Sequence, residues 1–130
     1  MTRKVNILIA DDEKDSCHFI QKGLTRQGFN VDVAFDGRDA LGKISIKKYD
    51  FIFLDFYMPE LTGTEVARII KEKNIKSIII ITSGYPKDSD FSKDVGVNEF
   101  LEKPFSFENI KSIISKYTKK DYSDAGKKSV

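Results

Sequence analysis

The sequence of 130 residues contains a single cysteine, Cys17, and a single histidine, His18. One cysteine excludes a disulfide within the chain and fits a reducing cytoplasm. Cys17 lies on the apolar stripe of a helical pattern, so we expect a partly buried, inert thiol. His18 lies two positions before Ile20, which points inward in the same pattern. This placement favours a solvent-facing histidine over a phosphocarrier or a metal ligand.

The sequence also lacks an excess of either charge and a long hydrophobic run. Its 22 Lys and Arg and 20 Asp and Glu leave a formal net charge of +2, which gives no reason to expect a nucleic-acid or membrane surface. The first apolar run, residues 5–10, is short and ends in acidic residues 11–13, so neither a signal peptide nor a membrane span is predicted. We therefore expect a cytoplasmic protein that contacts neither nucleic acid nor a membrane directly.

Five short apolar runs alternate with segments of helical spacing along the chain. The predicted strands cover residues 5–10, 31–35, 51–54, 78–81 and 99–103. The predicted helices cover about 13–27, a segment after the N-cap residue Asp36, a segment that begins at Thr62 with Glu65 in a capping-box pattern, a short segment at about 89–95, and a segment after Ser106. Helical periodicity ends near Lys119, so we predict one domain over residues 1–119 and a polar, disordered tail over residues 120–130.

This alternation predicts an α/β fold, with a parallel sheet, right-handed crossovers and helices on both faces. Residues 51–54 and 78–81 are apolar at every position, as central strands covered on both faces are. Residues 31–35 and 99–103 alternate with polar residues, as edge strands do. The pattern favours a flavodoxin-like, doubly wound five-stranded sheet of order 2-1-3-4-5 with five flanking helices, whose ligand site lies between the first and third strands.

Polar side chains follow the predicted strands where each strand ends. They are Asp11 and Asp12 after the first strand, Asp55 after the third, Thr82 at the end of the fourth and Lys103 at the end of the fifth. Carboxylates gathered at one edge repel each other unless a cation joins them, and hard oxygen ligands suit Mg²⁺. The sequence therefore predicts a Mg²⁺ site in which the Asp55 carboxylate can act as nucleophile toward a phosphoryl group. Lys103 and Thr82 are placed to contact phosphoryl oxygens.

Four motifs of this sequence resemble the receiver domain of bacterial two-component response regulators. They are ILIADDE at 7–13, LDFYMPE at 54–60 leading to Gly63, ITSG at 81–84 and EKPF at 102–105. The resemblance spans residues 4 to 119 and implies that Asp55 is the phosphoacceptor. It implies that Asp12, Asp55 and the backbone carbonyl of Tyr57 bind Mg²⁺ directly, with Asp11 acting mainly through water.

The same resemblance implies a switch and its partners. Thr82 and Lys103 would sense the phosphoryl group, and Phe100 occupies the aromatic switch position. Their movement would remodel the face formed by segments 89–95 and 99–103 and the last helix. The implied donor is a sensor histidine kinase or a histidine phosphotransfer protein, and the output is a downstream protein. The chain would be a monomer or a phosphorylation-dependent homodimer, and the Lys103–Pro104 peptide bond would be cis.

Two positions of the resemblance bear on the lifetime of the phosphoryl group. Tyr57 lies two residues after Asp55, and Gly84 lies two residues after Thr82. We predict that Tyr57 partly shields the phosphoryl group from water and that Gly84 leaves its side open. The expected reactions are self-phosphorylation from a phosphodonor and slow autodephosphorylation, without turnover of an external substrate.

Several other functions remain open on the same residues. Asp11 and Asp12, taken alone, would also suit the cap of the following helix. An aspartyl-nucleophile phosphatase of the haloacid dehalogenase type needs a second aspartate two residues after the nucleophile, where this chain has Tyr57. A phosphate-independent interaction module would be indicated by the loss of an acidic, threonine or lysine position, and none is lost. Flavin binding finds little support, because the acidic loop after the first strand would repel the flavin phosphate.

Overall fold

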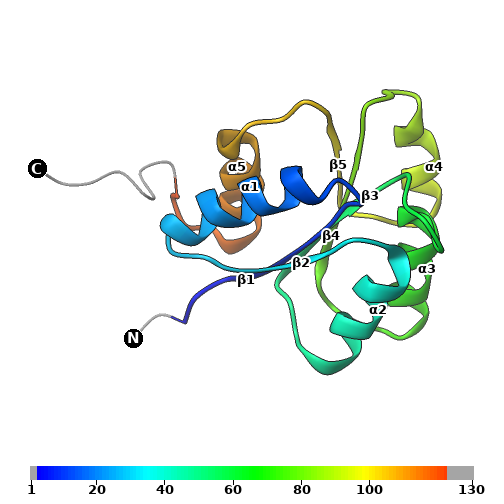
Figure 1. Cartoon of the computed structure of the whole chain (residues 1–130), viewed down its shortest axis with the longest axis horizontal. Helices are drawn as coiled ribbons and strands as arrows, with labels where there is room; N and C mark the ends of the chain where they lie inside the picture. The colour runs from blue at the N-terminus through cyan, green and yellow to red at the C-terminus, as the bar shows by residue number, and fades with distance from the viewer. Residues whose placement is uncertain (1–2, 123–130) are drawn as a thin grey trace, which may run out of the picture.

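The structure, a computed structural model, describes residues 3–122 and contains one five-stranded parallel sheet of order β2-β1-β3-β4-β5 (Figure 1). The strands are β1 (Asn6–Ala10), β2 (Asn30–Ala34), β3 (Phe51–Asp55), β4 (Ile78–Ser83) and β5 (Glu99–Glu102). The helices are α1 (Lys14–Arg26), α2 (Gly37–Ile46), α3 (Gly63–Glu72), α4 (Asp88–Asp94) and α5 (Phe107–Thr118). The predicted fold class and strand order are confirmed.

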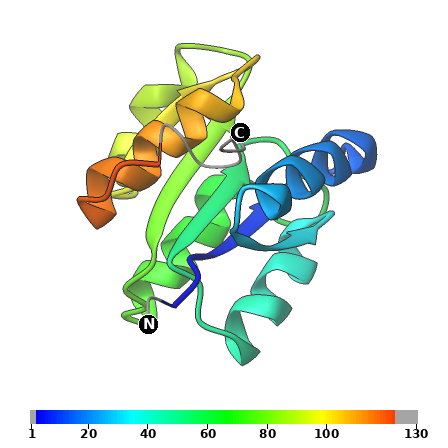
Figure 2. The same ribbon diagram turned by 90° about the vertical axis from the view of Figure 1, so that its left-hand side faces the viewer.

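The helices cover both faces of the sheet, α1 and α5 on one side and α2, α3 and α4 on the other (Figure 2). Alternate residues of each central strand face the two sides. In β3, Phe51 and Phe53 pack with α1 and α5, whereas Ile52 and Leu54 pack with α2 and α3. These four side chains are at most 2% exposed, so β3 lies at the centre of both apolar layers. Burial on both faces explains why the strand reads as a continuous apolar run.

Side-chain caps set where three of the helices begin. The Asp36 carboxylate accepts a hydrogen bond from the backbone N–H of Asp39 at 2.7 Å at the start of α2. Thr62 and Glu65 form the predicted capping box of α3. Ser106 forms a second capping box at α5, with Asn109 as its partner. Each cap satisfies backbone amides that the first helical turn leaves without an acceptor.

The two residues that occur only once, Cys17 and His18, differ in burial although they are neighbours on α1. The Cys17 side chain is fully buried, and its Sγ donates to the backbone carbonyl of Asp11 at 3.2 Å. Burial, with the nearby Asp11 carboxylate, raises the pKa of this thiol to about 12, so it stays protonated and unreactive at neutral pH. His18 is exposed, as predicted, and its ring meets the ring of Phe35 edge-on.

The remaining structural expectations concern short segments. The short helix predicted at 89–95 is α4, which begins at Asp88. The Lys103–Pro104 peptide bond is cis, as the resemblance implied. Within the predicted tail, the Tyr122 ring packs on Phe29, and residues 123–130 lie outside the described part of the chain. No helix in residues 3–122 is long and apolar enough to span a membrane.

Candidate functional site

Three aspartates meet at the carboxyl edge of the sheet. Asp11 and Asp12 follow β1, and Asp55 ends β3, its neighbour in the sheet. One carboxylate oxygen from each of Asp11, Asp12 and Asp55 lies within 4.8 Å of the other two. Because parallel strands point their carboxyl ends the same way, residues 43 or more positions apart come together without any long loop. The predicted acidic cluster is therefore present as a compact group.

Lys103 is the cation of this cluster. Its Nζ lies 2.9 Å from Oδ2 of Asp11 and 3.3 Å from Oδ1 of Asp55. Partial burial lowers the pKa of Lys103, but the hydrogen bond to Asp11 and the charges of both carboxylates outweigh it, so the net pKa is raised. The ammonium group therefore stays charged across the physiological range. One positive charge faces three carboxylates, which leaves the site with an excess of negative charge.

The Asp55 carboxyl group has the pKa expected of a buried acid. Asp55 is 7% exposed, and burial is the main reason that its pKa is raised to about 6. The Asp11 charge also raises this pKa, whereas Lys103 lowers it. The environment thus disfavours the ionised form of Asp55 in the protein alone. A bound cation would reverse this balance, because it would favour the carboxylate.

The donor set fits a hard divalent cation. Asp11 already uses both carboxylate oxygens, since Oδ1 accepts from the backbone N–H of Glu13 at 3.0 Å and Oδ2 accepts from Lys103. Asp12 is exposed, and its side chain makes no hydrogen bond or ion pair within residues 3–122. Asp12 and Asp55 therefore keep more free lone pairs than Asp11 does. Three clustered carboxylates with room for water on the exposed side suit Mg²⁺.

The backbone beside Asp55 is held by a close approach of α3. The N–H of Phe56 donates to the carbonyl of Thr82 at 2.8 Å, and the N–H of Gly63 donates to the carbonyl of Phe56 at 3.1 Å. A Cβ at Gly63 would lie 2.4 Å from the carbonyl oxygen of Asp55. Only glycine lets the first turn of α3 sit this close to the end of β3. This contact fixes the Asp55 backbone against a rigid helix.

The predicted switch residues lie on the next two strands. Thr82 is directly opposite Asp55 in the β3–β4 register and is 4% exposed. Its hydroxyl has no hydrogen-bond partner among the described residues, which leaves it able to donate to a group bound at Asp55. Phe100 of β5 lies opposite Ile81 of β4, and its half-buried ring packs against the α2–α3 layer. Its role as a switch stays a prediction.

Tyr57 and Gly84 border the site on its α4 side. Tyr57 is 51% exposed, and its hydroxyl donates to Oδ1 of Asp88 at 3.3 Å. Its ring lies 5.9 Å from that of Tyr85, edge to face. A Cβ at Gly84 would meet no atom within 4 Å, so the space around this residue is open. Asp88 is almost completely buried although it begins a polar seven-residue helix, so its local sequence gives no sign of its burial.

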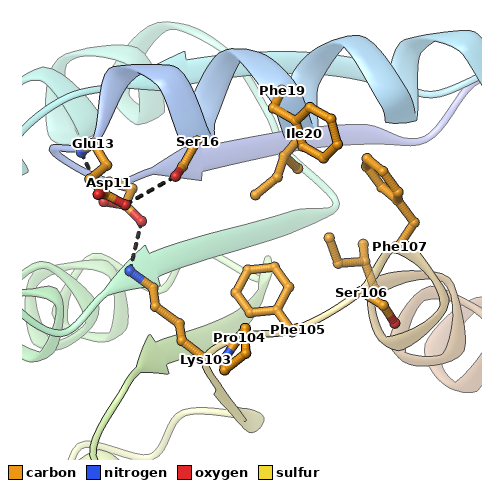
Figure 3. A pocket seen from close by; sticks show the side chains of 11 residues that line it. Asp11, Glu13, Ser16, Phe19, Ile20, Lys103, Pro104, Phe105, Ser106 and Phe107 are labelled. Atoms are coloured by element: carbon orange, nitrogen blue, oxygen red, sulfur yellow. Dashed lines mark hydrogen bonds and ion pairs between the residues drawn. The ribbon is translucent and has the colours of Figure 1, made fainter.

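An apolar groove of about 680 Å³ opens beside Asp11 and Lys103. It runs between α1 and the loop that joins β5 to α5. Figure 3 shows Lys103 reaching toward Asp11, with the rings of Phe19, Phe105 and Phe107 around the gap. Phe19 is 68% exposed although it lies on the same helix as the buried Cys17. Helical spacing gave no signal of this groove, because its walls come from segments more than 80 residues apart.

Comparison with known proteins identifies relatives among the response regulators. The family model of the response regulator receiver domain matches residues 7–115. The response regulator ArlR of Staphylococcus aureus is 35% identical over 126 residues, which is 91% of this chain but 56% of the relative. The chain thus spans about half the length of the curated relatives it matches.

Solved structures agree in both fold and sequence. The receiver domain of the Francisella response regulator 1452 superposes with a TM-score of 0.80 at 32% identity, covering 88% of this chain and 99% of that one. The response regulator TrrA of Thermotoga maritima, solved in complex with Mg²⁺ and BeF, gives a TM-score of 0.78 at 33% identity, covering 86% and 97%.

Proposed function

The chain belongs to the response regulator receiver domain family, and from this premise we propose that it is a phosphoacceptor switch of a cytoplasmic two-component phosphorelay with Asp55 as acceptor. The observation that carries this proposal is the position of the Asp55 carboxylate. It ends a buried strand, lies beside two further aspartates, and contacts the ammonium group of Lys103. A nucleophilic carboxylate needs this combination of a fixed position and nearby positive charge.

The transfer is a substitution at phosphorus. A carboxylate oxygen of Asp55 forms a bond to the phosphorus of a phosphohistidine on the partner, and the bond from phosphorus to the imidazole nitrogen breaks. The leaving imidazole takes up a proton, and Asp55 becomes an acyl phosphate. Lys103 offsets the charge of a phosphoryl oxygen, and the Thr82 hydroxyl donates a hydrogen bond to another.

Mg²⁺ is the proposed cofactor of this site. Asp12, Asp55 and the backbone carbonyl of Tyr57 would hold it directly, with Asp11 acting mainly through water. When bound, the ion supplies positive charge that stabilises the phosphoryl oxygens during transfer. The clustered carboxylate oxygens support this assignment, as does the Mg²⁺ in the structure of the Thermotoga relative.

The donor is proposed to dock on the apolar groove beside Lys103. A phosphohistidine partner must approach Asp55 from outside, and the exposed ring of Phe19 borders the groove next to the site. Phe19→Ala should slow transfer from a phosphorylated histidine phosphotransfer protein and leave acceptance from acetyl phosphate unchanged. Ile46→Ala, which removes an 85% exposed side chain on α2, is the matched control. Equal rates for both variants with the protein donor would refute this docking site.

The output is proposed to be a shift of the α4–β5–α5 face. Thr82 would move toward the bound phosphoryl group and Phe100 would turn inward, which changes the surface seen by a downstream protein or a second copy of the chain. Amide chemical shifts measured with and without acetyl phosphate test this. Shifts confined to the residues around Asp55 would contradict it.

The proposed function as a whole is tested by intact mass after incubation with acetyl phosphate. One phosphoryl adduct should form in the presence of Mg²⁺, and none should form without Mg²⁺ or in Asp55→Asn. A folded chain that gains no adduct under any condition would favour a phosphate-independent interaction module. Turnover of a generic phosphate ester would instead revive the phosphatase alternative.

A further inference from the structure

Asp88 is a buried carboxylate without a cationic partner. It is 2% exposed and begins α4, and it makes no ion pair with any residue in 3–122. The other two buried aspartates, Asp11 and Asp55, both lie beside Lys103. A carboxylate buried without a cation must be stabilised by hydrogen-bond donors, and those donors then depend on it for their own positions.

Both oxygens of Asp88 accept hydrogen bonds from hydroxyl groups. The Ser83 hydroxyl donates to Oδ2 at 2.6 Å, a length typical of a hydrogen bond to an ionised acceptor. The Tyr57 hydroxyl donates to Oδ1 at 3.3 Å. Ser83 in turn accepts from the backbone N–H of Tyr85 at 3.0 Å. The carboxylate therefore joins the loop after β3, the end of β4 and the start of α4.

These contacts surround the acceptor on its α4 side. Ser83 directly follows Thr82, and Tyr57 lies two residues after Asp55. Partial burial and the Asp88 charge, and to a smaller extent the Asp55 charge, raise the pKa of Tyr57. The phenol group is thus within electrostatic reach of both carboxylates.

We propose that Asp88 is a positioning residue that holds Tyr57 across the α4 side of the acceptor and thereby sets the lifetime of the acyl phosphate. The inference rests on the proposed function, because it concerns the product formed at Asp55. In hydrolysis a water oxygen forms a bond to phosphorus, the bond from phosphorus to Asp55 breaks, and inorganic phosphate leaves with the carboxylate restored. A ring held near Asp55 excludes the attacking water, and a ring released from Asp88 admits it.

The test measures the first-order loss of the phosphoryl adduct by intact mass after acetyl phosphate is removed, with Mg²⁺ present. Tyr57→Phe removes the hydrogen bond to Asp88 but keeps the ring and the Ser83 contact. Asp88→Ala removes the bond from the other side. Asp90→Ala is the matched control, because Asp90 is an exposed carboxylate on the same helix without a side-chain contact in the described residues.

Tyr57→Phe and Asp88→Ala should each accelerate hydrolysis about two- to fivefold, the range that the loss of one weak hydrogen bond allows. The double variant should be no faster than the faster single variant, because both changes remove the same contact. Asp90→Ala should match the wild type in both adduct formation and hydrolysis.

An unchanged or slower hydrolysis in Tyr57→Phe would overturn the role of Asp88 and leave the proposed function intact. Additive effects in the double variant would also overturn it, since they would mean that Asp88 acts by another route. Tyr57→Phe keeps the test valid even if Asp88→Ala does not fold. A wild-type chain that never forms an adduct would overturn the proposed function and this inference together.

Discussion

One aspartate lies just before strand β3 and another is its last residue, and their surroundings shift the two carboxyl pKa values in opposite directions. Asp50 precedes the strand and accepts two hydrogen bonds from the Arg3 guanidinium, at 2.7 and 2.8 Å, and one from the backbone N–H of Asn6 at 2.8 Å. The bond to Arg3 outweighs partial burial and lowers the pKa of Asp50. At the other end, burial and the Asp11 charge raise the pKa of Asp55 to about 6.

This difference separates a carboxylate that stabilises the fold from one that is available for chemistry. Asp50 is surrounded by donors that favour its charge, and its backbone also pairs with Asn6 and Ile78 to align three strands at the amino edge of the sheet. Asp55 faces two other carboxylates and a single ammonium group. A bound cation would relieve the excess negative charge there. The surroundings of an aspartate, and not its residue type alone, therefore distinguish the acceptor from a structural carboxylate.

The largest expected effect is on phosphorylation. Asp55→Asn should abolish the adduct formed from acetyl phosphate and Mg²⁺, because the amide is not a nucleophile toward phosphorus. Asp50→Asn should form the adduct at the wild-type rate. Intact mass spectrometry of both variants measures this, and an adduct that depends on Asp50 instead would erase the distinction between the two ends of β3.

The next effect concerns the contact that fixes Asp55. Gly63→Ala should lower the free energy of unfolding by about 1–3 kcal/mol, since its Cβ would collide with the Asp55 carbonyl oxygen at 2.4 Å. Gly84→Ala is the control, because its Cβ would meet no atom within 4 Å. Urea unfolding monitored by circular dichroism compares the two. Equal stability would mean that α3 can move away from the acceptor without loss.

Asp55 should also be a stability cost in the protein without Mg²⁺. Its pKa is about 6 in the folded chain against 3.8 ordinarily, so the folded state holds its proton more tightly and stability falls as pH rises through this window. Asp55→Asn should therefore raise the free energy of unfolding by roughly 1–3 kcal/mol at pH 7 and by little near pH 3.5. Urea titrations at both pH values in a chelator measure it. If Asp55→Asn instead lowered the free energy of unfolding at pH 7, the Asp55 carboxylate would stabilise the fold as that of Asp50 does.

The smallest effect is expected at the amino edge, with the opposite sign. The lowered pKa of Asp50 stabilises the folded state above pH 3.8 and is lost as pH falls through the folded value. Because Arg3 is exposed, Asp50→Asn should lower stability by only about 0.5–1 kcal/mol at pH 7. The difference from wild type should shrink on acidification. A difference independent of pH would point to packing, not charge, as its cause.

The sequence was sufficient for the fold and for grouping the polar residues at the strand ends. Apolar strands 51–54 and 78–81 identified the centre of the sheet, and the caps at Thr62 and Ser106 located two helix starts. Asp55, Thr82 and Lys103 could be grouped because parallel strands bring their carboxyl ends to one edge. That inference needs only the strand order, which periodicity provides.

What the sequence did not reveal depends on contacts between distant segments. Asp88 lies in a short polar stretch that reads as exposed, and its burial depends on the hydroxyls of Ser83 and Tyr57. Arg3 and Asp50 are 47 positions apart and share no periodic pattern. The spacing of residues within a helix or strand predicts which face each residue occupies. It does not predict which residues of other helices, strands or loops will contact it.

The most direct test of the central claim is to locate the phosphoryl group. The wild-type chain is incubated with acetyl phosphate and Mg²⁺ and reduced with borohydride, which converts an aspartyl phosphate into homoserine. Peptide mass spectrometry then identifies the modified position. Homoserine at position 55, with Asp11, Asp12 and Asp50 unchanged, is the predicted result. Homoserine at any of those three positions, or at none, would contradict the claim that the surroundings of Asp55 make it the acceptor.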